Sequence, residues 1–408
     1  MCAASAKDVS IDSYSPIIGE DKVEEIKAFA SALAGKSVCQ VNSTAFGGGV
    51  AEILRRLVPL MRSLGLKAEW KVMKGSEEFF SVTKKMHNGL QGMSIQLTDD
   101  MKKTYLEFNE VNSKELDLHH DYVVVHDVQP AAIISQYKIR VGKWVWRCHI
   151  DLSNPNLDFV SFLTPVLFQY DSLIFTLEEY VPEPLKSKKI AVIAPSIDPL
   201  SPKNKPLSED EILDVLGKFD VDPEKPILTQ VSRFDPWKDP LGVIDVYRIV
   251  KKQVPDVQLL LIGSMARDDP EGWVFYEKTA RYAADDYSIH LLTDWKGVGD
   301  VEVNAFQRAS DVVLQKSIRE GFGLSVSEAL WKEVPVVGGN VGGIPLQIID
   351  GQNGFLVESV QEAADKTMFL LKHVDAAKRM GKMGREHVRG NFLITRLLMD
   401  ELKLLKSL

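Results

Sequence analysis

The sequence predicts an α/β protein built from two doubly wound domains, each with a parallel sheet covered by helices on both faces. Short β-branched and apolar runs alternate with longer amphipathic runs along most of the chain. The alternation pauses once, near the midpoint, in a stretch at 193–210 that is rich in Pro, Ser and charge. Alternating strands and helices favour parallel sheets, and a polar break of this kind favours a linker between two domains.

In the first half of the chain, strand candidates and helical patterns follow one another in turn. The strand candidates are SVCQVN at 37–42, AEWKVM at 68–73, YVVVHD at 122–127, KWVWRCHI at 143–150, SLIFTL at 172–177 and KIAVIAP at 189–195. Helical patterns lie between them at 51–65, 76–88, 101–111 and 157–168. This order of elements predicts a first domain at 1–195.

The second half repeats the pattern. Its strand candidates are PILTQVSR at 226–233, QLLLIGS at 258–264, IHLLTD at 289–294, DVVLQKS at 311–317 and PVVGG at 335–339. Its helical patterns are at 240–252, 271–283, 301–309 and 324–332. We therefore expect a second domain at 196–390, followed at 391–408 by an amphipathic helix with apolar residues at near-helical spacing.

Composition narrows the class of protein. The chain has 408 residues and a net charge of -8, which argues against a nucleic-acid binder or a basic membrane-surface protein. Its three cysteines have no metal-ligand spacing, and an odd count does not make a disulfide framework. Residues 1–16 lack the apolar core of a signal peptide, and no run is long enough to span a membrane. We expect a cytoplasmic protein.

The most informative motif is REGFGLSVSEA, which begins at Arg319. Gly321 and Gly323 follow Glu320, and a helical run then carries Glu328. A Gly-rich loop that opens a helix exposes N–H groups beside a positive dipole end, which suits a diphosphate. Carboxylates instead suit hydroxyls, so the combination predicts a nucleotide-diphospho-sugar site. The alternative is a surface glutamate on a solvated loop.

The stretch TQVSRFDPWKDPLG carries two cations in another predicted strand-to-helix loop. Arg233 and Lys238 follow a predicted strand and precede a predicted helix. Arg can grip a phosphate with two parallel hydrogen bonds, and Lys supplies a compact charge. Together they would neutralise a leaving diphosphate as its charge grows. The alternative is an exposed basic pair in a loop.

Two further glycine-rich turns stand between predicted elements. Gly47–Gly49 does not complete the G-x-G-x-x-G dinucleotide fingerprint, because Glu52 takes the third glycine's place. A nicotinamide enzyme is therefore not supported. The loop would let a sugar or phosphate approach the backbone closely, or it is a tight turn. VGGIP at 341–345 is open to the same two interpretations.

Polar side chains also follow two strands of the first domain. His126 and Asp127 come after YVVV, and Arg147, His149 and Asp151 come at and after the end of WVWRC. Ligands of open α/β sheets bind at the carboxyl ends of strands, so these groups are candidates for binding sugar hydroxyls. Their alternative role is to cap a loop. If the two domains face each other across a deep cleft, each would hold one of two substrates that meet there.

FGGGVAE, SRFDPWKDP and EGFGLSVSEA, in this order, resemble the retaining glycosyltransferases of family 4, which have the two-domain GT-B architecture. Within this family the chain is most similar to the trehalose glycosyltransferring synthases, through stretches such as WRCHIDLSNPNLDF and DDPEGW. Trehalose phosphorylases share much of the pattern. The resemblance implies that glucose passes from a nucleoside-diphosphate glucose to free glucose, reversibly and with retention, giving α,α-trehalose. It also implies a terminal helix that crosses back to the first domain.

The resemblance assigns roles to the candidate residues. The catalytic set is Glu320, Arg233 and Lys238. The donor set is Arg233, Lys238, Glu320, Gly321, Phe322, Gly323, Leu324 and Glu328, with Glu328 on the ribose. The acceptor set is Gly48, Gly49, Arg147, His149, Asp151 and His126. No metal site is assigned.

No cofactor is expected to be required, although Mg²⁺ would serve as a counter-ion for the phosphates. The expected partners are nucleoside-diphosphate glucose, glucose and trehalose, in a homodimer that binds neither nucleic acid nor membrane. The donor base (uridine, adenosine or another), the acceptor range and the favoured direction stay open. The competing hypotheses are a phosphorylase, another nucleotide-sugar-dependent transferase and a non-catalytic sugar-binding protein.

Overall fold

The structure is a computed structural model that describes residues 9–46, 48–137, 139–264 and 272–408. Gly47 and most of the DDPEGW stretch lie outside the described residues. The chain divides into two compact units. The first contains the described residues up to Ser196 together with Ile394–Leu408, and the second contains those from Ile197 to Leu393.

The first unit is built around a six-stranded parallel sheet of order β2-β1-β3-β4-β5-β6. Its strands are β1 (Ser37–Asn42), β2 (Lys67–Val72), β3 (Tyr122–His126), β4 (Lys143–Arg147), β5 (Ser172–Phe175) and β6 (Ile190–Val192). Every strand falls on a run that the sequence predicts to be extended. The order reverses at β1, which lies between β2 and β3.

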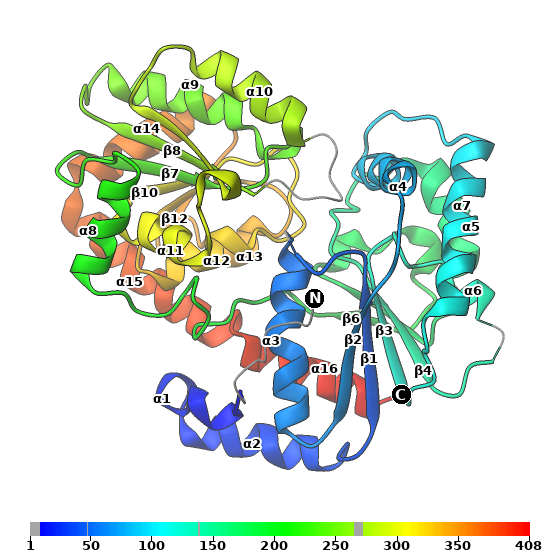
Figure 1. The fold of residues 1–408 in the computed structure, drawn as a ribbon. Coiled ribbons are helices and arrows are strands. Elements are labelled where there is room, and N and C mark those ends of the chain that lie inside the picture. The colour runs from blue at the N-terminus through cyan, green and yellow to red at the C-terminus, as the bar shows by residue number, and fades with distance from the viewer. Residues whose placement is uncertain (1–8, 47, 138, 265–271) are drawn as a thin grey trace. The chain divides into compact units, whose positions relative to one another are not determined.

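Helices cover both faces of this sheet (Figure 1). The helices of this unit are η1 (Ile11–Tyr14), α1 (Ser15–Ile18), α2 (Glu20–Ser31), α3 (Gly49–Ser63), α4 (Glu77–Leu90), α5 (Asp99–Glu115), α6 (Ile133–Gln136), α7 (Leu157–Leu167), η2 (Glu178–Tyr180), η3 (Glu183–Leu185) and α16 (Ile394–Lys406). Ser76, Thr98 and Asn156 cap α4, α5 and α7 by accepting backbone N–H bonds, which fixes where these helices begin.

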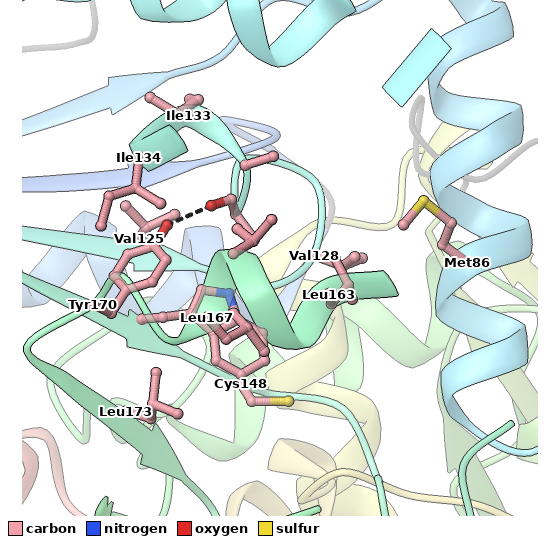
Figure 2. Close-up of a cluster of buried hydrophobic side chains, with 14 of the residues drawn as sticks. Met86, Val125, Val128, Ile133, Ile134, Cys148, Leu163, Leu167, Tyr170 and Leu173 are labelled. Atoms are coloured by element: carbon pink, nitrogen blue, oxygen red, sulfur yellow. Dashed lines mark hydrogen bonds between the residues drawn. The ribbon is translucent and has the colours of Figure 1, made fainter. Parts of the chain in front are cut away.

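A hydrophobic core lies between one face of the sheet and the helices α4, α5 and α7 (Figure 2). Val125 and Leu173 of the strands pack there with Leu163 and Leu167 of α7. The hydroxyl of Tyr170 is buried in the same cluster and donates a hydrogen bond of 2.7 Å to the carbonyl of Ala131. A satisfied hydroxyl lets this large ring be buried without stranding a polar group.

The second unit holds another six-stranded parallel sheet, of order β12-β11-β10-β7-β8-β9. Its strands are β7 (Ile227–Val231), β8 (Gln258–Gly263), β9 (Ile289–Thr293), β10 (Val312–Gln315), β11 (Val336–Gly339) and β12 (Gly354–Val357). Its helices are α8 (Glu209–Lys218), η4 (Pro236–Lys238), α9 (Pro240–Lys251), α10 (Gly272–Ala283), η5 (Asp294–Lys296), α11 (Asp300–Ala309), α12 (Leu324–Trp331), α13 (Ile344–Gln347), α14 (Val360–Lys372) and α15 (Val374–Asn391).

Alternate residues of the second sheet fill two separate cores. Leu259 and Leu261 of β8 pack on the face covered by α9 and α14, whereas Leu260 and Ile262 pack with residues of α8 and α11. A strand buried on both faces reads as a continuous apolar run, which explains why QLLLIG lacks the usual polar alternation. The predicted α/β class with two parallel sheets is confirmed.

The chain enters the second unit through the stretch predicted to be a linker, and this stretch is bound to the unit. The side chain of Lys332, the C-cap of α12, donates to Asn204 Oδ1 at 2.8 Å, and Asn304 of α11 donates to the carbonyls of Pro202 and Lys205. At the other end of the chain, α16 contacts α2 and α3 of the first unit. Among the described residues, no helix is long and apolar enough to cross a membrane.

Candidate active site

Several candidate residues lie where a sheet reverses its strand order. In the second unit β7 pairs with both β8 and β10, and in the first unit β1 pairs with both β2 and β3. The loops that leave two such neighbouring strands diverge to opposite faces, and the space between them is the usual ligand site of an open α/β sheet. Arg233 and Lys238 follow β7, and Glu320 follows β10.

Lys238 and Glu320 meet at this switch point of the second unit. Lys238 Nζ lies 2.6 Å from Glu320 Oε2, which also accepts hydrogen bonds from Ser317 Oγ at 3.2 Å and Gln315 Nε2 at 3.4 Å. The loops are joined by the backbone as well, because the carbonyl of Trp237 accepts the N–H of Ile318 at 2.7 Å. The fold thus brings two of the three predicted catalytic residues into direct contact.

Arg233 lies on the same β7 loop and is one-third exposed. Its Nη2 is 3.4 Å from Oδ2 of Asp235, a carboxylate that is 1% exposed. Asp235 Oδ1 accepts the backbone N–H of Trp237 at 2.8 Å and so begins η4. Asp235 therefore holds the loop that presents Lys238 and also faces the Arg233 guanidinium.

The glycine loop at the start of α12 has a steric requirement for glycine. Gly323 is the N-cap of the helix with φ +84, a conformation that other residues rarely adopt, and it has no side chain to cap the first turn. A Cβ on Gly343 would lie 2.7 Å from both the Gly321 carbonyl oxygen and Phe322 Cα. The 341–345 turn therefore packs directly against the glycine loop.

Glu328 lies in the second turn of α12, as predicted, and is 1% exposed. Its Oε1 is 3.1 Å from Nζ of Lys203, a residue of the stretch that leads into the second unit. Lys332, one turn later, donates to the Glu328 carbonyl at 3.1 Å. The predicted role of Glu328 on a ribose stays a prediction, and the structure adds Lys203 as its charged partner.

In the first unit the two candidate histidines contact each other at the carboxyl ends of β3 and β4. His126 Nδ1 is 3.0 Å from His149 Nε2, and the two ring planes differ by 17° with their centroids 5.3 Å apart. Burial, with the Arg147 charge second, lowers the pKa of both imidazoles well below its usual value. Both rings are therefore neutral at neutral pH, when each can donate one hydrogen bond and accept another.

Arg147 is inside the first unit, with 1% of its side chain exposed. Its Nη1 is 2.5 Å from Oε1 of Glu401 on α16, and its Nη2 donates to the carbonyl of Ile193 at 3.3 Å. Burial is the main cause that lowers the pKa of Arg147 and raises the pKa of Glu401. The structure thus places Arg147 among protein partners, in contact with Glu401 and the carbonyl of Ile193.

Two aspartates shape the loops beside these histidines. Asp127 has a positive φ of 62, and its Oδ1 accepts the backbone N–H of His149 at 2.7 Å. Asp151 is 2% exposed, and its Oδ1 accepts the N–H of Ser153 at 2.9 Å. Each therefore supports a turn, which is the loop-capping alternative considered for these positions.

Gly48 and Gly49 are exposed at the start of α3, where Gly48 is the N-cap. Gly48 has an ordinary extended conformation, with φ -152, and an added Cβ would meet nothing within 4 Å. Neither the backbone nor the packing of the described residues therefore requires glycine at this position. A ligand that approaches the backbone closely would require it.

Gly48→Ala is accordingly expected to separate activity from stability. Alanine is a poorer N-cap than glycine, but it also lowers the conformational entropy of the unfolded chain. These effects oppose each other, so the free energy of unfolding should change by less than about 1 kcal/mol. Turnover should fall at least about tenfold if a substrate packs on the loop. Gly217→Ala, where an added Cβ also meets nothing within 4 Å, is the matched control. Unchanged turnover in Gly48→Ala would remove the loop from the site.

The histidine pair predicts acid sensitivity of the first unit. An imidazole with a depressed folded pKa binds its proton more readily when the chain is unfolded, so stability is lost as pH falls below the unfolded value of about 6.5. Each histidine contributes up to about 1.4 kcal/mol per pH unit in that range. Chemical denaturation at pH 7.5 and 5.5 measures this dependence.

The matched control for this measurement is His126→Gln with His149→Gln. The difference between it and the parent protein isolates the two imidazoles from Glu401, whose pKa burial raises. The prediction would be contradicted if the parent protein and the control lost the same amount of stability between pH 7.5 and pH 5.5.

No group of three or more His, Cys, Asp or Glu side chains among the described residues is arranged to hold a metal ion.

The residues of these hydrogen-bond and ion-pair networks that the sequence patterns did not single out are Gln40, Lys203 and Glu401. Gln40 interrupts an apolar strand and Glu401 stands among leucines of α16. A polar residue at an apolar position of the pattern is the signal that could have identified both.

Comparisons with known proteins give a family match in each unit. Residues 40–182 match the family model for the trehalose synthase N-terminal domain, and residues 215–387 match the model for glycosyl transferases group 1. The trehalose synthase of Thermococcus litoralis is 57% identical over 97% of this chain and 97% of its own. A trehalose phosphorylase of Pleurotus pulmonarius is 27% identical over 93% of this chain and 58% of its own.

A solved structure confirms the predicted GT-B fold. The sucrose-phosphate synthase of Thermosynechococcus elongatus superposes with a TM-score of 0.71 over 91% of this chain and 98% of its own, at 16% identity. Identity this low supports the fold alone. The 57% identity to the Thermococcus litoralis enzyme over nearly the full length, with a matching family model in each unit, shows that this chain belongs to the trehalose synthase family of glycosyltransferases.

Proposed function

We propose that this protein is a retaining glucosyltransferase that forms α,α-trehalose from a nucleoside-diphosphate glucose and glucose, reversibly. The observation that carries the proposal is the meeting of Lys238 and Glu320 at the switch point of the second sheet, with Arg233 on the same loop as Lys238. It supplies cations for a diphosphate and a carboxylate for hydroxyl groups within one small region. Family membership supports the same chemistry.

In this proposal Arg233 and Lys238 stabilise the departing nucleoside diphosphate. Breaking the bond between the anomeric carbon and the phosphate oxygen places growing negative charge on that oxygen. Arg233 is one-third exposed and Lys238 is 16% exposed, so both are accessible to a ligand while remaining partly desolvated. Partial desolvation strengthens their attraction for an anion compared with fully exposed cations.

Glu320 would accept hydrogen bonds from hydroxyls of the donor glucose. Its carboxylate is 5% exposed and already holds Lys238, Ser317 and Gln315 around Oε2. These contacts keep the carboxylate in one orientation before the donor binds, which reduces the cost of ordering it. When the diphosphate binds, Lys238 would bridge it to Glu320, because an ammonium group has three N–H donors.

The proposed reaction retains the α-configuration by front-face substitution. The acceptor hydroxyl attacks on the side that the diphosphate leaves, and the departing phosphate oxygen takes the acceptor's proton. No protein nucleophile is assigned. The residues of this chain contribute by binding the diphosphate more strongly as its charge increases, which is the interaction that lowers the barrier.

The acceptor would be held by groups of the first unit. His149 is half-buried at the carboxyl end of β4, and the exposed Gly48 and Gly49 follow β1. Arg147 and His126 are 1% exposed, so we assign them to holding His149 in position rather than to contacting the sugar. The lack of a cofactor requirement, the role of Mg²⁺ as a phosphate counter-ion, the homodimer and the cytoplasmic location stay predictions.

One experiment tests the proposal directly. The protein is incubated with uridine- or adenosine-diphosphate glucose and a panel of sugars, and NMR identifies the disaccharide and the configuration of both anomeric carbons. We expect α,α-trehalose from glucose, together with the free nucleoside diphosphate. A β-linked product, or nucleotide-sugar binding with no transfer to any sugar in the panel, would refute it.

A phosphorylase is the second candidate, because the similarity to the Pleurotus pulmonarius enzyme extends over 93% of this chain. It would split trehalose with inorganic phosphate and release glucose 1-phosphate without any nucleotide. A parallel incubation of the protein with trehalose and phosphate separates the two candidates. We expect no glucose 1-phosphate in that incubation, and its formation would favour the phosphorylase.

A further inference from the structure

Polar residues of the first sheet form a buried group on the face opposite the core of Figure 2. Gln40 on β1, His126 on β3 and Arg147 on β4 take strand positions whose neighbours, such as Val41 and Trp146, pack into that core. Because side chains alternate along a strand, the three polar groups lie on the other face. Glu401 on α16 meets them there.

These residues form one continuous hydrogen-bonded chain. Arg147 Nη1 binds Glu401 Oε1, and Glu401 Oε2 is 3.3 Å from Gln40 Nε2. Gln40 Oε1 is 2.7 Å from His126 Nε2. His126 Nδ1 is 3.0 Å from His149 Nε2. This series of hydrogen bonds therefore connects the terminal helix to the half-buried imidazole of His149.

The Glu401 carboxylate is the fixed end of this chain. Arginine keeps its proton in proteins, so a buried Arg147 requires an anion beside it. Glu401 is the carboxylate in contact with Arg147 and is therefore ionised. An ionised carboxylate only accepts hydrogen bonds, so Gln40 must turn its NH₂ group toward Glu401 and its carbonyl oxygen toward His126.

This orientation determines the proton positions on both imidazoles. The Gln40 oxygen is an acceptor, so His126 carries its proton on Nε2, and in the neutral ring Nδ1 is left as an acceptor. His149 must then donate from Nε2, which leaves its own Nδ1 with a lone pair. His149 Nδ1 has no hydrogen-bond partner among the described residues.

We propose that Glu401 and Gln40 are positioning residues that hold His149 in the tautomer whose Nδ1 accepts a hydrogen bond from a hydroxyl of the acceptor sugar. This inference rests on the proposed function, in which His149 contacts the acceptor. A hydroxyl can donate or accept, so the tautomer decides which way it points. The opposite tautomer would present an N–H group and turn the hydroxyl's proton away.

The first measurement needs no activity and is made on the parent protein. In protein labelled with ¹⁵N-histidine, long-range ¹H–¹⁵N correlation spectra distinguish the two neutral tautomers of each ring. Signals are assigned with His126→Gln and His149→Gln. We expect both rings to carry the proton on Nε2 at pH 7.5. A proton on Nδ1 of His149 would overturn the proposal.

The second measurement uses Gln40→Met, which removes the amide and leaves the Arg147–Glu401 pair in place. We expect a mixture of His149 tautomers, an acceptor KM about tenfold higher and a donor KM within about twofold of the parent protein. Gln258→Met is the matched control, since Gln258 is also a buried strand glutamine with two side-chain hydrogen bonds to a neighbouring loop. Its His149 signals and acceptor KM should be those of the parent protein.

Two further outcomes would overturn the proposal. One is a Gln40→Met protein whose histidine tautomers are unchanged, and the other is a changed tautomer with an unchanged acceptor KM. Failure of the proposed function has a different signature. The parent protein would then make no disaccharide from any acceptor, and His149 would have no acceptor sugar to bind. The imidazole signals would still decide whether the hydrogen-bonded network sets the tautomer of His149.

Discussion

Arg233→Ala is expected to lower kcat about 100- to 1,000-fold, with a smaller change in the KM for the nucleotide-sugar. Removing one group that stabilises developing charge in a preorganised site costs this much in other enzymes. Arg233 is one-third exposed and close to Asp235, so the loss should fall on the transition state rather than on folding. Initial rates at saturating donor, with the product measured by chromatography, provide the test.

The control for this variant is Arg281→Ala on α10, an exposed arginine paired with Glu277 one helical turn away. It removes the same charge from the same unit and should leave kcat unchanged. Unfolding curves of both variants establish that each is folded. Turnover of Arg233→Ala near that of the parent protein at saturating donor would show that the diphosphate is not held by this residue.

Arg147→Met should destabilise the first unit by about 3–5 kcal/mol, the usual cost of leaving one partner of a buried ion pair alone. Glu401 would remain 2% exposed without the guanidinium that neutralises it, and the carbonyl of Ile193 would lose a donor. Chemical denaturation at pH 7.5, with the transition of the first unit followed by near-ultraviolet circular dichroism, measures the change.

Combining Arg147→Met with Glu401→Leu tests the cause of that loss. Replacing both charges with apolar groups removes the stranded carboxylate, so the double variant should recover most of the stability. Equal destabilisation of the single and double variants would mean that packing, rather than charge, is responsible. The acceptor KM of the double variant should be higher than that of the parent protein, because Gln40 then lacks the carboxylate that orients it.

Much of the arrangement at the carboxyl edge of the second sheet could be predicted from local sequence. Gly323 follows a strand candidate and opens a helix, and Arg233 follows another strand candidate. Parallel strands place their carboxyl ends at one edge of a sheet, so these residues were expected at the same edge before the strand order was known. The same reasoning placed His126 and His149 at the edge of the first sheet.

The role of Arg147 could not be predicted in this way. It is the last residue of β4, and a strand end does not reveal on which face of the sheet a side chain is buried. Its partner Glu401 is 254 positions later in the chain, on a helix whose leucines predict only that one side is apolar. The packing of α16 in the first unit decides that these two charges meet.

By itself, the sequence determined the α/β class, the parallel sheets and the loops that carry the glycines and cations, because these follow from periodicity and turn chemistry within short windows. Only the tertiary structure decided the partners. Lys238 meets Glu320 across 82 positions and Gln40 meets Glu401 across 361, because β10 lies beside β7 and α16 belongs to the first unit. Strand order and helix docking arise from packing of the whole chain, and no local pattern encodes them.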